Sequence, residues 1–286
     1  MCCQAAQTSG GCVTRCTQYR GNQFIGARGK RQMQIQPNQF ICADNMEVLR
    51  EIPDGFCDLC LTDPPYGIGA DRNLRANTQY GNALAPSRDY GSVSWDNAIP
   101  NDGVFAALRR VSKHQIVWGG NYFTAHLEPS PCWLVWDKVT GDNGYADCEL
   151  AWASFGSAVR YFRYQWKGFL QENMGAAKEE RYHPTQKPVP LFVWCLLRYT
   201  NPGDLVIDPF CGSGTTALAC HKTGRRFICI DREQKYIDIA QQRYADLIAQ
   251  QDLFGNQDAR AGQGECPGTA CNSGRDAMPK QVELGL

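Results

Sequence analysis

The sequence predicts an α/β fold built on a doubly wound, mostly parallel sheet. Short apolar runs, which indicate buried strands, alternate with amphipathic segments, which indicate helices, over about residues 37–253. Several of the apolar runs end on an aspartate that is followed by a turn. In open sheets of this kind, ligands bind outside the carboxyl ends of the strands. We therefore expect the functional residues in the turns that follow the strands.

In the first half of this region, the apolar patterns predict a strand or turn at 39–44, a helix at 45–52, a strand at 56–63, a helix at 102–112, and strands at 114–120, 133–138 and 148–155. Pro53 ends the first helix, because a proline cannot continue the backbone hydrogen bonds. Two prolines likewise end the strand at 56–63.

In the second half, the patterns predict a helix at 190–200, a strand at 204–210, a helix at 214–223, a strand at 226–231 and a long helix at 232–250. Pro188 and Pro190 stand at the start of the first of these helices, where proline is tolerated. Gly224 ends the second helix. Strands separated by helices are typical of parallel sheets.

The length and composition limit the possible domain organisation and class of protein. The chain has 286 residues, no net charge and 43% hydrophobic residues, enough to bury a large core. We expect a basic, disordered tail at 1–36, a catalytic domain at 37–253 and a second disordered tail at 254–286, because both ends are polar and aperiodic. A chain without a membrane-spanning run or a signal peptide is expected to be cytoplasmic.

The 15 cysteines do not indicate a metal site. Cys57 and Cys60 form a C-x-x-C pattern, but they lie within an apolar strand, where positions three apart point to opposite faces. They are better explained as small core residues. The cysteines of the two tails show no zinc-ligand spacing, so we expect no metal cofactor.

A glycine-rich turn follows the strand at 204–210. The strand ends on Asp208, Gly212-Ser213-Gly214 opens the next helix, and the following strand ends on Asp231. An acid at the tip of the neighbouring strand is placed to bind the hydroxyls of a ribose. The turn lacks the Lys-Ser/Thr of a phosphate loop and the third glycine of the dinucleotide fingerprint. A nucleoside cofactor without phosphates fits best, and S-adenosylmethionine is such a cofactor.

The stretch "DPPY", residues 63–66, stands at the end of another strand. Pro65 fixes its own backbone and holds Pro64 extended, which directs the Pro64 carbonyl. Asp63 and that carbonyl form two acceptors for one NH₂ group, and Tyr66 offers a face for stacking. By itself the stretch could equally be a strand that ends in a stiff turn.

The stretch "HPTQKP", residues 183–188, precedes the helix at 190–200. A helix N-terminus with a nearby lysine attracts an anion such as the carboxylate of a methionine moiety. A proline-rich helix entry with a surface lysine is the alternative interpretation.

Together, "DPPY", "HPTQKP" and "DPFCGSGTT" resemble the DNA amino-methyltransferases. Their order resembles that of the permuted β group, in which the catalytic half precedes the cofactor half, and the aspartate resembles the adenine-N6 type. The resemblance covers about residues 39–250 and implies a seven-stranded methyltransferase sheet of the Rossmann-like type with one antiparallel strand near its edge. It also implies a bacterial or bacteriophage-encoded protein, with a restriction nuclease as a possible partner.

The resemblance assigns roles to residues of this chain. It implies catalysis by Asp63, Pro64, Pro65 and Tyr66. It implies S-adenosylmethionine binding by Asp44, Thr185, Lys187, Asp208, Phe210, Gly212, Gly214 and Asp231. Ala43 stands where the family has a glycine before Asp44.

Double-stranded DNA is the expected partner, and a base inside a duplex must be flipped out to reach such a pocket. Residues 156–182 occupy the position of a target-recognition region. The expected DNA-binding residues are basic or aromatic: Arg160, Tyr161, Arg163, Tyr164, Trp166 and Lys167, with Arg72, Arg75 and Arg88 in a second loop. Trp152 is a candidate for stacking on the flipped base, although core packing explains it better.

The sequence leaves three alternatives open. A cytosine-N4 methyltransferase would use the same cofactor, but it more often has a serine in place of Asp63. A protein glutamine methyltransferase has its cofactor motif first and an asparagine in place of this aspartate, so it fits less well. A catalytically silent DNA-binding module on the same fold is the third alternative, and the presence of Asp63 and Asp231 argues against it.

Overall fold

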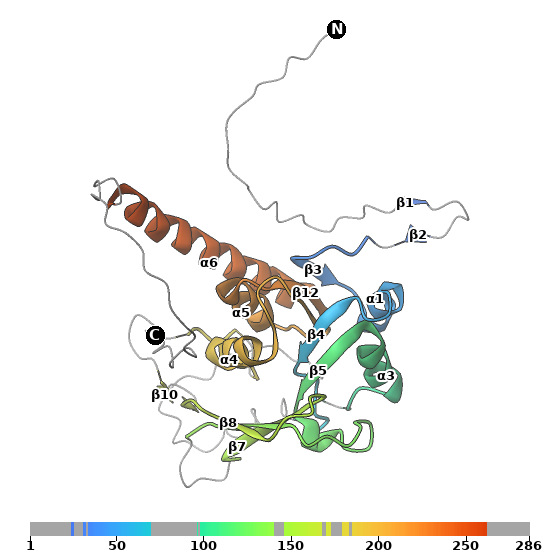
Figure 1. Cartoon of the computed structure of the whole chain (residues 1–286). Coiled ribbons are helices and arrows are strands. Elements are labelled where there is room, and N and C mark those ends of the chain that lie inside the picture. Colours follow the sequence, from blue (N-terminus) through green and yellow to red (C-terminus); the bar gives the residue numbers. More distant parts are fainter. Residues whose placement is uncertain are drawn as a thin grey trace, which may run out of the picture.

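The computed structural model describes residues 24–25, 31–32, 34–69, 96, 98–139, 146–167, 170–172, 179–182 and 185–261. Figure 1 shows a central sheet with helices on both faces. No helix within these ranges is long and apolar enough to cross a membrane.

The central sheet has eight strands in the order β3-β12-β11-β4-β5-β7-β6-β8. Their bounds are β3 Gln39–Cys42, β4 Cys57–Thr62, β5 Ser112–Trp118, β6 Trp133–Asp137, β7 Cys148–Ala153, β8 Arg160–Arg163, β11 Leu205–Asp208 and β12 Arg226–Asp231. Within this sheet, β7 alone runs antiparallel to its neighbours. The mostly parallel α/β fold that the sequence predicts is confirmed.

The sequence predicted seven strands, and the structure has an eighth, β8, at the edge of the sheet. β8 pairs in parallel with β6, with Leu134 opposite Arg160 and Asp137 opposite Arg163. It was expected to be part of the target-recognition region. Of its four residues, Phe162 is half-buried and packs against the core, and the other three are exposed.

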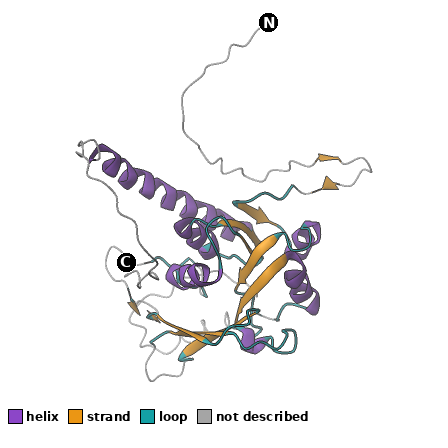
Figure 2. Cartoon of the chain, in the orientation of Figure 1, coloured by secondary structure: helices purple, strands orange, loops and turns teal. Residues whose placement is uncertain are grey.

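Two helical layers cover the sheet. One contains α1 Asn45–Glu51 and α3 Asp102–Val111, and the other contains α4 Val189–Tyr199, α5 Thr215–Thr223 and α6 Gln234–Ala261. Figure 2 shows the two helical layers on opposite sides of the strands. Each layer buries its own apolar cluster against the sheet, so the parallel strands are apolar on both faces.

The remaining elements are short. β1 Phe24–Ile25 pairs with β2 Arg31–Gln32, and β9 Trp166–Lys167 pairs with β10 Leu170–Gln171, both antiparallel. A single 3₁₀ turn, η1 Gly120–Tyr122, follows β5. β1 and β2 lie within the expected N-terminal tail, and α6 runs past residue 253 to Ala261. The division into two tails and one catalytic domain stays a prediction.

Candidate functional site

A cavity of about 500 Å³ opens at the carboxyl edge of the sheet. Turns after four parallel strands (β3, β4, β11 and β12) line it, together with the segment before α4. The cavity has the size of a small-molecule site. Its lining includes seven of the predicted cofactor residues and two of the predicted catalytic ones: Asp44, Thr185, Lys187, Asp208, Phe210, Gly212, Asp231, Asp63 and Pro65.

The loop after β11 faces Asp231 at the tip of β12. The backbone N–H of Gly212 donates to Asp231 Oδ2 at 3.0 Å, and that of Glu233 donates to Oδ1 at 2.9 Å. An ionised carboxylate has about four acceptor positions. Asp231 therefore keeps capacity for two hydroxyl donors from the cavity, as a ribose requires. Burial raises the pKa of this carboxyl group.

Gly214 has a packing role in the structure. It starts α5 with a φ of 83°, and a Cβ there would lie 2.6 Å from the Cβ of Ala240 on α6. Any larger residue would push the two helices apart. The sequence predicted that Gly214 lines the cofactor loop, but this contact shows that it fixes the packing of α5 against α6.

Asp208 lines the cavity but is almost completely buried. Its carboxylate accepts hydrogen bonds from the hydroxyl of Thr62 at 2.8 Å, from the backbone N–H of Phe210 at 3.1 Å and from the hydroxyl of Thr216. Burial raises its pKa to about 7, against these donors, which lower it. The carboxylate thus joins the ends of β4 and β11 to the start of α5.

Asp44 caps the N-terminus of α1. Its carboxylate accepts from the backbone N–H of Met46 at 2.9 Å and of Glu47 at 3.4 Å. The same residue lines the cavity beside Thr185 and Phe210, so the cap also fixes the position of a carboxylate at the cavity wall.

Asp63, Tyr66 and Lys187 form one hydrogen-bonded group. The hydroxyl of Tyr66 donates to Asp63 Oδ1 at 2.6 Å, and the ammonium of Lys187 donates to Asp63 Oδ2 at 2.6 Å and to the hydroxyl of Tyr66 at 3.0 Å. The resemblance implied that Lys187 binds the cofactor, and the structure shows its ammonium in contact with Asp63, the predicted catalytic aspartate. The "DPPY" and "HPTQKP" stretches therefore meet at the ammonium nitrogen of Lys187.

Glu149 is a charged residue of this group that the sequence interpretation did not single out. Its Oε2 lies 3.0 Å from Lys187 Nζ, and its Oε1 accepts from Lys138 Nζ at 3.0 Å. Glu149 stands at the start of β7, the antiparallel strand, so it lies at the edge where the parallel strands end. The sequence feature that could have indicated Glu149 is a charged residue near the start of an otherwise apolar strand.

The charges of this group shift the pKa values of Asp63, Glu149 and Lys187. Burial raises the pKa of Asp63, and Lys187 opposes this effect while Glu149 adds to it. Burial alone would also raise the pKa of Glu149, but Lys187 and Lys138 outweigh it and hold the value at about 2. Burial would lower the pKa of Lys187, but Asp63 and Glu149 outweigh it and raise the value. Glu149 and Lys187 are therefore charged at neutral pH.

The ring of Tyr66 occupies a fixed position. It stacks on the ring of Tyr122 with centroids 4.9 Å apart, and Tyr122 is 43% exposed. Gly119, with a φ of 72°, makes room for it, because a Cβ there would lie 2.1 Å from the Tyr66 ring. Pro64 and Pro65 precede the ring, and the structure has no cis peptide bond in its described residues.

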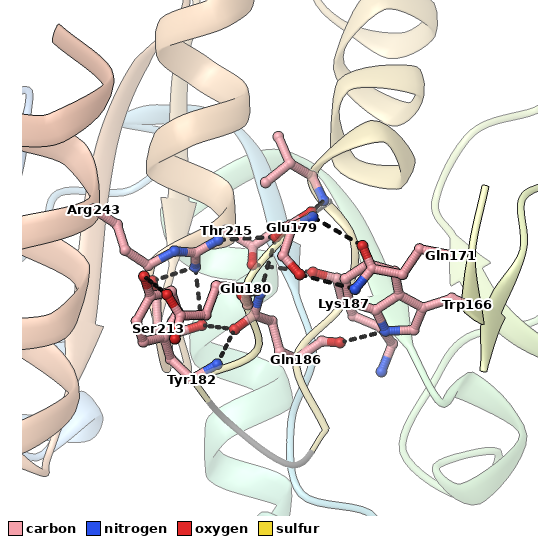
Figure 3. Close-up of polar contacts among 11 residues, drawn as sticks. Trp166, Gln171, Glu179, Glu180, Tyr182, Gln186, Lys187, Ser213, Thr215 and Arg243 are labelled. Atoms are coloured by element: carbon pink, nitrogen blue, oxygen red, sulfur yellow. Dashed lines mark hydrogen bonds and ion pairs between the residues drawn. The ribbon is translucent and has the colours of Figure 1, made fainter. Parts of the chain in front are cut away.

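A second polar cluster, here called the clasp, lies behind the cofactor loop and consists of Glu179, Gln186, Ser213 and Arg243 (Figure 3). The guanidinium of Arg243 donates to the Ser213 carbonyl at 2.7 Å and to Glu179 Oε1 at 2.9 Å. The Ser213 hydroxyl donates to Gln186 Oε1, and Gln186 Nε2 donates to Glu179 Oε1, both at 2.9 Å. The clasp joins α6 to the loop and to the segment that carries Lys187.

The predicted DNA-binding residues divide by exposure. Arg160, Tyr161 and Arg163 are exposed on β8, and both Tyr161 and Arg163 contact Asp137. Tyr164 and Trp166 are each only 5% exposed and belong to the apolar core, so burial removes them from a DNA-binding surface.

Other predicted residues lie elsewhere. Arg72, Arg75 and Arg88 fall outside the described residues, and the side chain of Lys167 is not described. Trp152 packs in the core, and its indole N–H donates to the Glu128 carbonyl at 2.8 Å. Cys57 and Cys60 are free, buried core residues. The part of the chain that is described contains no group of His, Cys, Asp or Glu residues that could hold a metal ion.

A comparison with protein families matches residues 112–242 to the family described as DNA methylase, of the N6/N4 type. Among characterised proteins, the chain is 25% identical over 237 residues to the type II methyltransferase M.HpaI of Haemophilus parainfluenzae, with 72% of this chain and 73% of the relative covered. It is 27% identical over 252 residues to the type II methyltransferase M.BglII of Bacillus subtilis, with 72% and 68% covered.

Solved structures give two further similarities. The M1.HpyAVI–SAM complex is 24% identical, with a TM-score of 0.43 and coverage of 72% of this chain and 98% of that one. The cytosine-N4-specific PvuII DNA methyltransferase is 14% identical, with a TM-score of 0.49 and coverage of 74% and 91%.

Proposed function

We propose that this chain, a DNA methyltransferase of the N6/N4 family, transfers the methyl group of S-adenosylmethionine to the N6 amine of an adenine flipped out of double-stranded DNA. The observation that carries the proposal is the position of Asp63. Its carboxylate lines the same cavity as Gly212 and Asp231, so an acceptor for an amine lies beside a site for a nucleoside.

The residues of the cavity fit S-adenosylmethionine. Asp231 has acceptor capacity for the two ribose hydroxyls, and Phe210 offers an apolar face. Thr185, in the segment before α4, lines the same cavity and is assigned to the methionine end. When bound, the cofactor supplies the electrophilic methyl group.

Asp63 activates the amine. The N6 lone pair of adenine is delocalised into the ring, so the nitrogen is a poor nucleophile. Hydrogen bonds from the NH₂ group to Asp63 and to the Pro64 carbonyl draw the nitrogen toward tetrahedral geometry and stabilise the positive charge that develops on it. After transfer the nitrogen is acidic, and its proton passes to the Asp63 carboxylate.

Tyr66 and the hydrogen bonds around it orient the acceptor. The Tyr66 hydroxyl and Lys187 each occupy one oxygen of Asp63, which fixes the plane of the carboxylate. Acceptor positions remain on both oxygens for the amine. Orientation of amine and methyl group in the cavity contributes a further large part of the rate.

The exposed residues of β8 are the proposed DNA contact. Tyr161 and Arg163 lie on one face of this edge strand, and Arg160 is exposed on the other face. Phosphate contacts of this kind make binding depend on salt concentration. The chain fits a type II modification enzyme, whose activity protects DNA from a nuclease of the same specificity.

Nucleoside analysis tests the proposal. Purified protein, labelled S-adenosylmethionine and unmethylated duplex DNA should yield labelled N6-methyladenine. Label on N4-methylcytosine would overturn the choice of base but keep the reaction class. Cofactor binding without any label on DNA would indicate a silent module, and label on protein would overturn the DNA substrate.

A further inference from the structure

Two carboxylates share the ammonium of Lys187. Asp63 Oδ2 lies 2.6 Å from it and Glu149 Oε2 lies 3.0 Å from it. The side chain of Lys187 is only 6% exposed, and those of Asp63 and Glu149 are 17% and 23% exposed. Three charged groups therefore meet where little water can screen them.

We propose that Glu149 is a positioning residue for methyl transfer, which holds Lys187 against Asp63 and offsets the positive charge of Lys187 beside the amine. This proposal rests on the proposed function, because it needs an amine that becomes positively charged at Asp63. Glu149 acts through Lys187 and Asp63 and is not placed in contact with the base.

The charge of the group explains why a second carboxylate is needed. Lys187 and Asp63 alone would form a neutral pair, which gives little stabilisation to a developing cation. Glu149 offsets the charge of Lys187, and Lys138 in turn pairs with Glu149, so the two carboxylates and two ammonium groups sum to zero and the charge of Asp63 is not cancelled by Lys187 alone. The ammonium of Lys138 donates to the other oxygen of Glu149, Oε1. This contact fixes the orientation of the Glu149 carboxylate.

The topology explains why Glu149 reaches this place. β7 runs antiparallel to β5 and β6, so its first residues lie at the edge where the parallel strands end. Glu149 pairs in register with Trp136 on β6, one residue before the end of that strand. The antiparallel strand thus supplies a carboxylate that complements the one at the end of β4.

The groups that face Asp63 predict the direction of a pH effect. They are Lys187 before α4, Glu149 on β7, Tyr66 after β4 and Asp208 at the end of β11. Of these, Glu149 acts to raise the pKa of Asp63 and Lys187 acts to lower it. Replacement of Glu149 by glutamine removes the first effect and leaves the second. The pKa of Asp63 then falls, and the acid limb of the pH profile moves to lower pH.

The test compares Glu149→Gln with Glu149→Asp and with the control Glu128→Gln, which removes one exposed negative charge on the loop before β6. In Glu149→Gln we expect kcat to fall about 50-fold, as for one unit charge about 7 Å away at an effective dielectric constant of about 20. The dissociation constant for S-adenosylhomocysteine and the KM for DNA should stay within about twofold, since Glu149 is not placed at either ligand. Glu149→Asp should recover most of kcat, and Glu128→Gln should match the parent protein.

Carboxyl NMR titration of Asp63 in protein labelled with ¹³C-aspartate gives a readout that does not need activity. A lower pKa in Glu149→Gln than in the parent supports the proposal. An unchanged pKa with unchanged kcat overturns it. A second set of results would also overturn it. If kcat falls equally in Glu149→Gln and Glu149→Asp, the acid limb of the kcat–pH profile does not move and Tm falls, then Glu149 is only structural.

The two proposals fail differently. If the parent protein methylates cytosine N4, the adenine assignment fails, but the ratio of kcat values between Glu149→Gln and the parent still tests Glu149. If the product is N6-methyladenine and Glu149→Gln behaves as the parent, the role of Glu149 fails alone.

Discussion

Gln186 and Lys187 are neighbours in the sequence, but their side chains enter two different polar clusters. Lys187 joins Asp63, Tyr66 and Glu149 at the cavity, and Gln186 joins the clasp behind the cofactor loop. In the clasp one cation meets one carboxylate, so its charges balance. At the cavity two carboxylates share Lys187, and one of them, Glu149, also pairs with Lys138.

We propose that this difference separates a cluster that holds the fold from one that does chemistry. Complete hydrogen bonding around a buried ion pair rigidifies a structure, and a carboxylate at a cavity stabilises a positive charge that appears there. One short segment, 185–187, connects both clusters. Folding stability should therefore depend on the clasp, and catalysis on the cavity group.

The largest effect is expected for Asp63→Ala. Loss of the acceptor should lower kcat by about 10³-fold or more, because the amine loses its hydrogen bond and the developing charge its counter-charge. Single-turnover transfer of labelled methyl measures it, with S-adenosylhomocysteine titration for cofactor binding. Binding should be largely kept.

The matched control for that variant is Asp54→Ala, which removes an aspartate whose side chain is 81% exposed and should leave kcat unchanged. Loss of both transfer and cofactor binding in Asp63→Ala would mean that the cavity group is structural as well. The proposed division between a structural clasp and a catalytic cavity group would then be wrong.

The next effect is expected for Arg243→Met in the clasp. It leaves the Glu179 carboxylate buried without its cation, and the free energy of unfolding should fall by about 3 kcal/mol. Chemical denaturation measures the loss. With saturating cofactor and below the unfolding transition, kcat should stay within about threefold of the parent value.

Arg198→Met is the control, since Arg198 is exposed on α4, stacks on Trp194, and should change stability by at most about 0.5 kcal/mol. The double variant Arg243→Met/Glu179→Gln should recover part of the lost stability, because no buried charge is left unpaired. Full stability with a large loss of kcat would show that the clasp takes part in the reaction.

A smaller effect, with a definite sign, is expected for Lys187→Met. Without the ammonium, Asp63 faces Glu149 directly, and its pKa rises because Lys187 was the group that lowered it. The acid limb of the kcat–pH profile should move to higher pH, so kcat falls on the acid side of the profile and recovers at alkaline pH. The shift is opposite to that expected for Glu149→Gln.

Lys113→Met serves as the control, because Lys113 pairs with Asp58 at 2.7 Å but its side chain is 60% exposed. Its pH profile should match that of the parent. A downward shift of the acid limb in Lys187→Met would contradict the assignment of Lys187 as the group that keeps Asp63 ionised.

Much of the site could be predicted because it follows strand ends. Asp63, Asp208 and Asp231 each come directly after an apolar run, and parallel strands bring such positions to one edge. The order of the motifs along the chain then indicated the family. The eighth strand could not be predicted in this way, because the interleaved basic and aromatic residues of 160–167 suit a nucleic-acid surface as well as a strand.

The sequence by itself determined the alternation of strands and helices, the resemblance to the DNA amino-methyltransferases and the residues at the carboxyl ends of the parallel strands, since these depend on local pattern and motif. Only the tertiary structure decided which charges meet. Glu149 reaches Lys187 because β7 reverses direction, and Arg243 reaches Ser213 because α6 packs against α5 at Gly214 and Ala240. Contacts between segments so far apart depend on strand direction and helix packing, which no local pattern encodes.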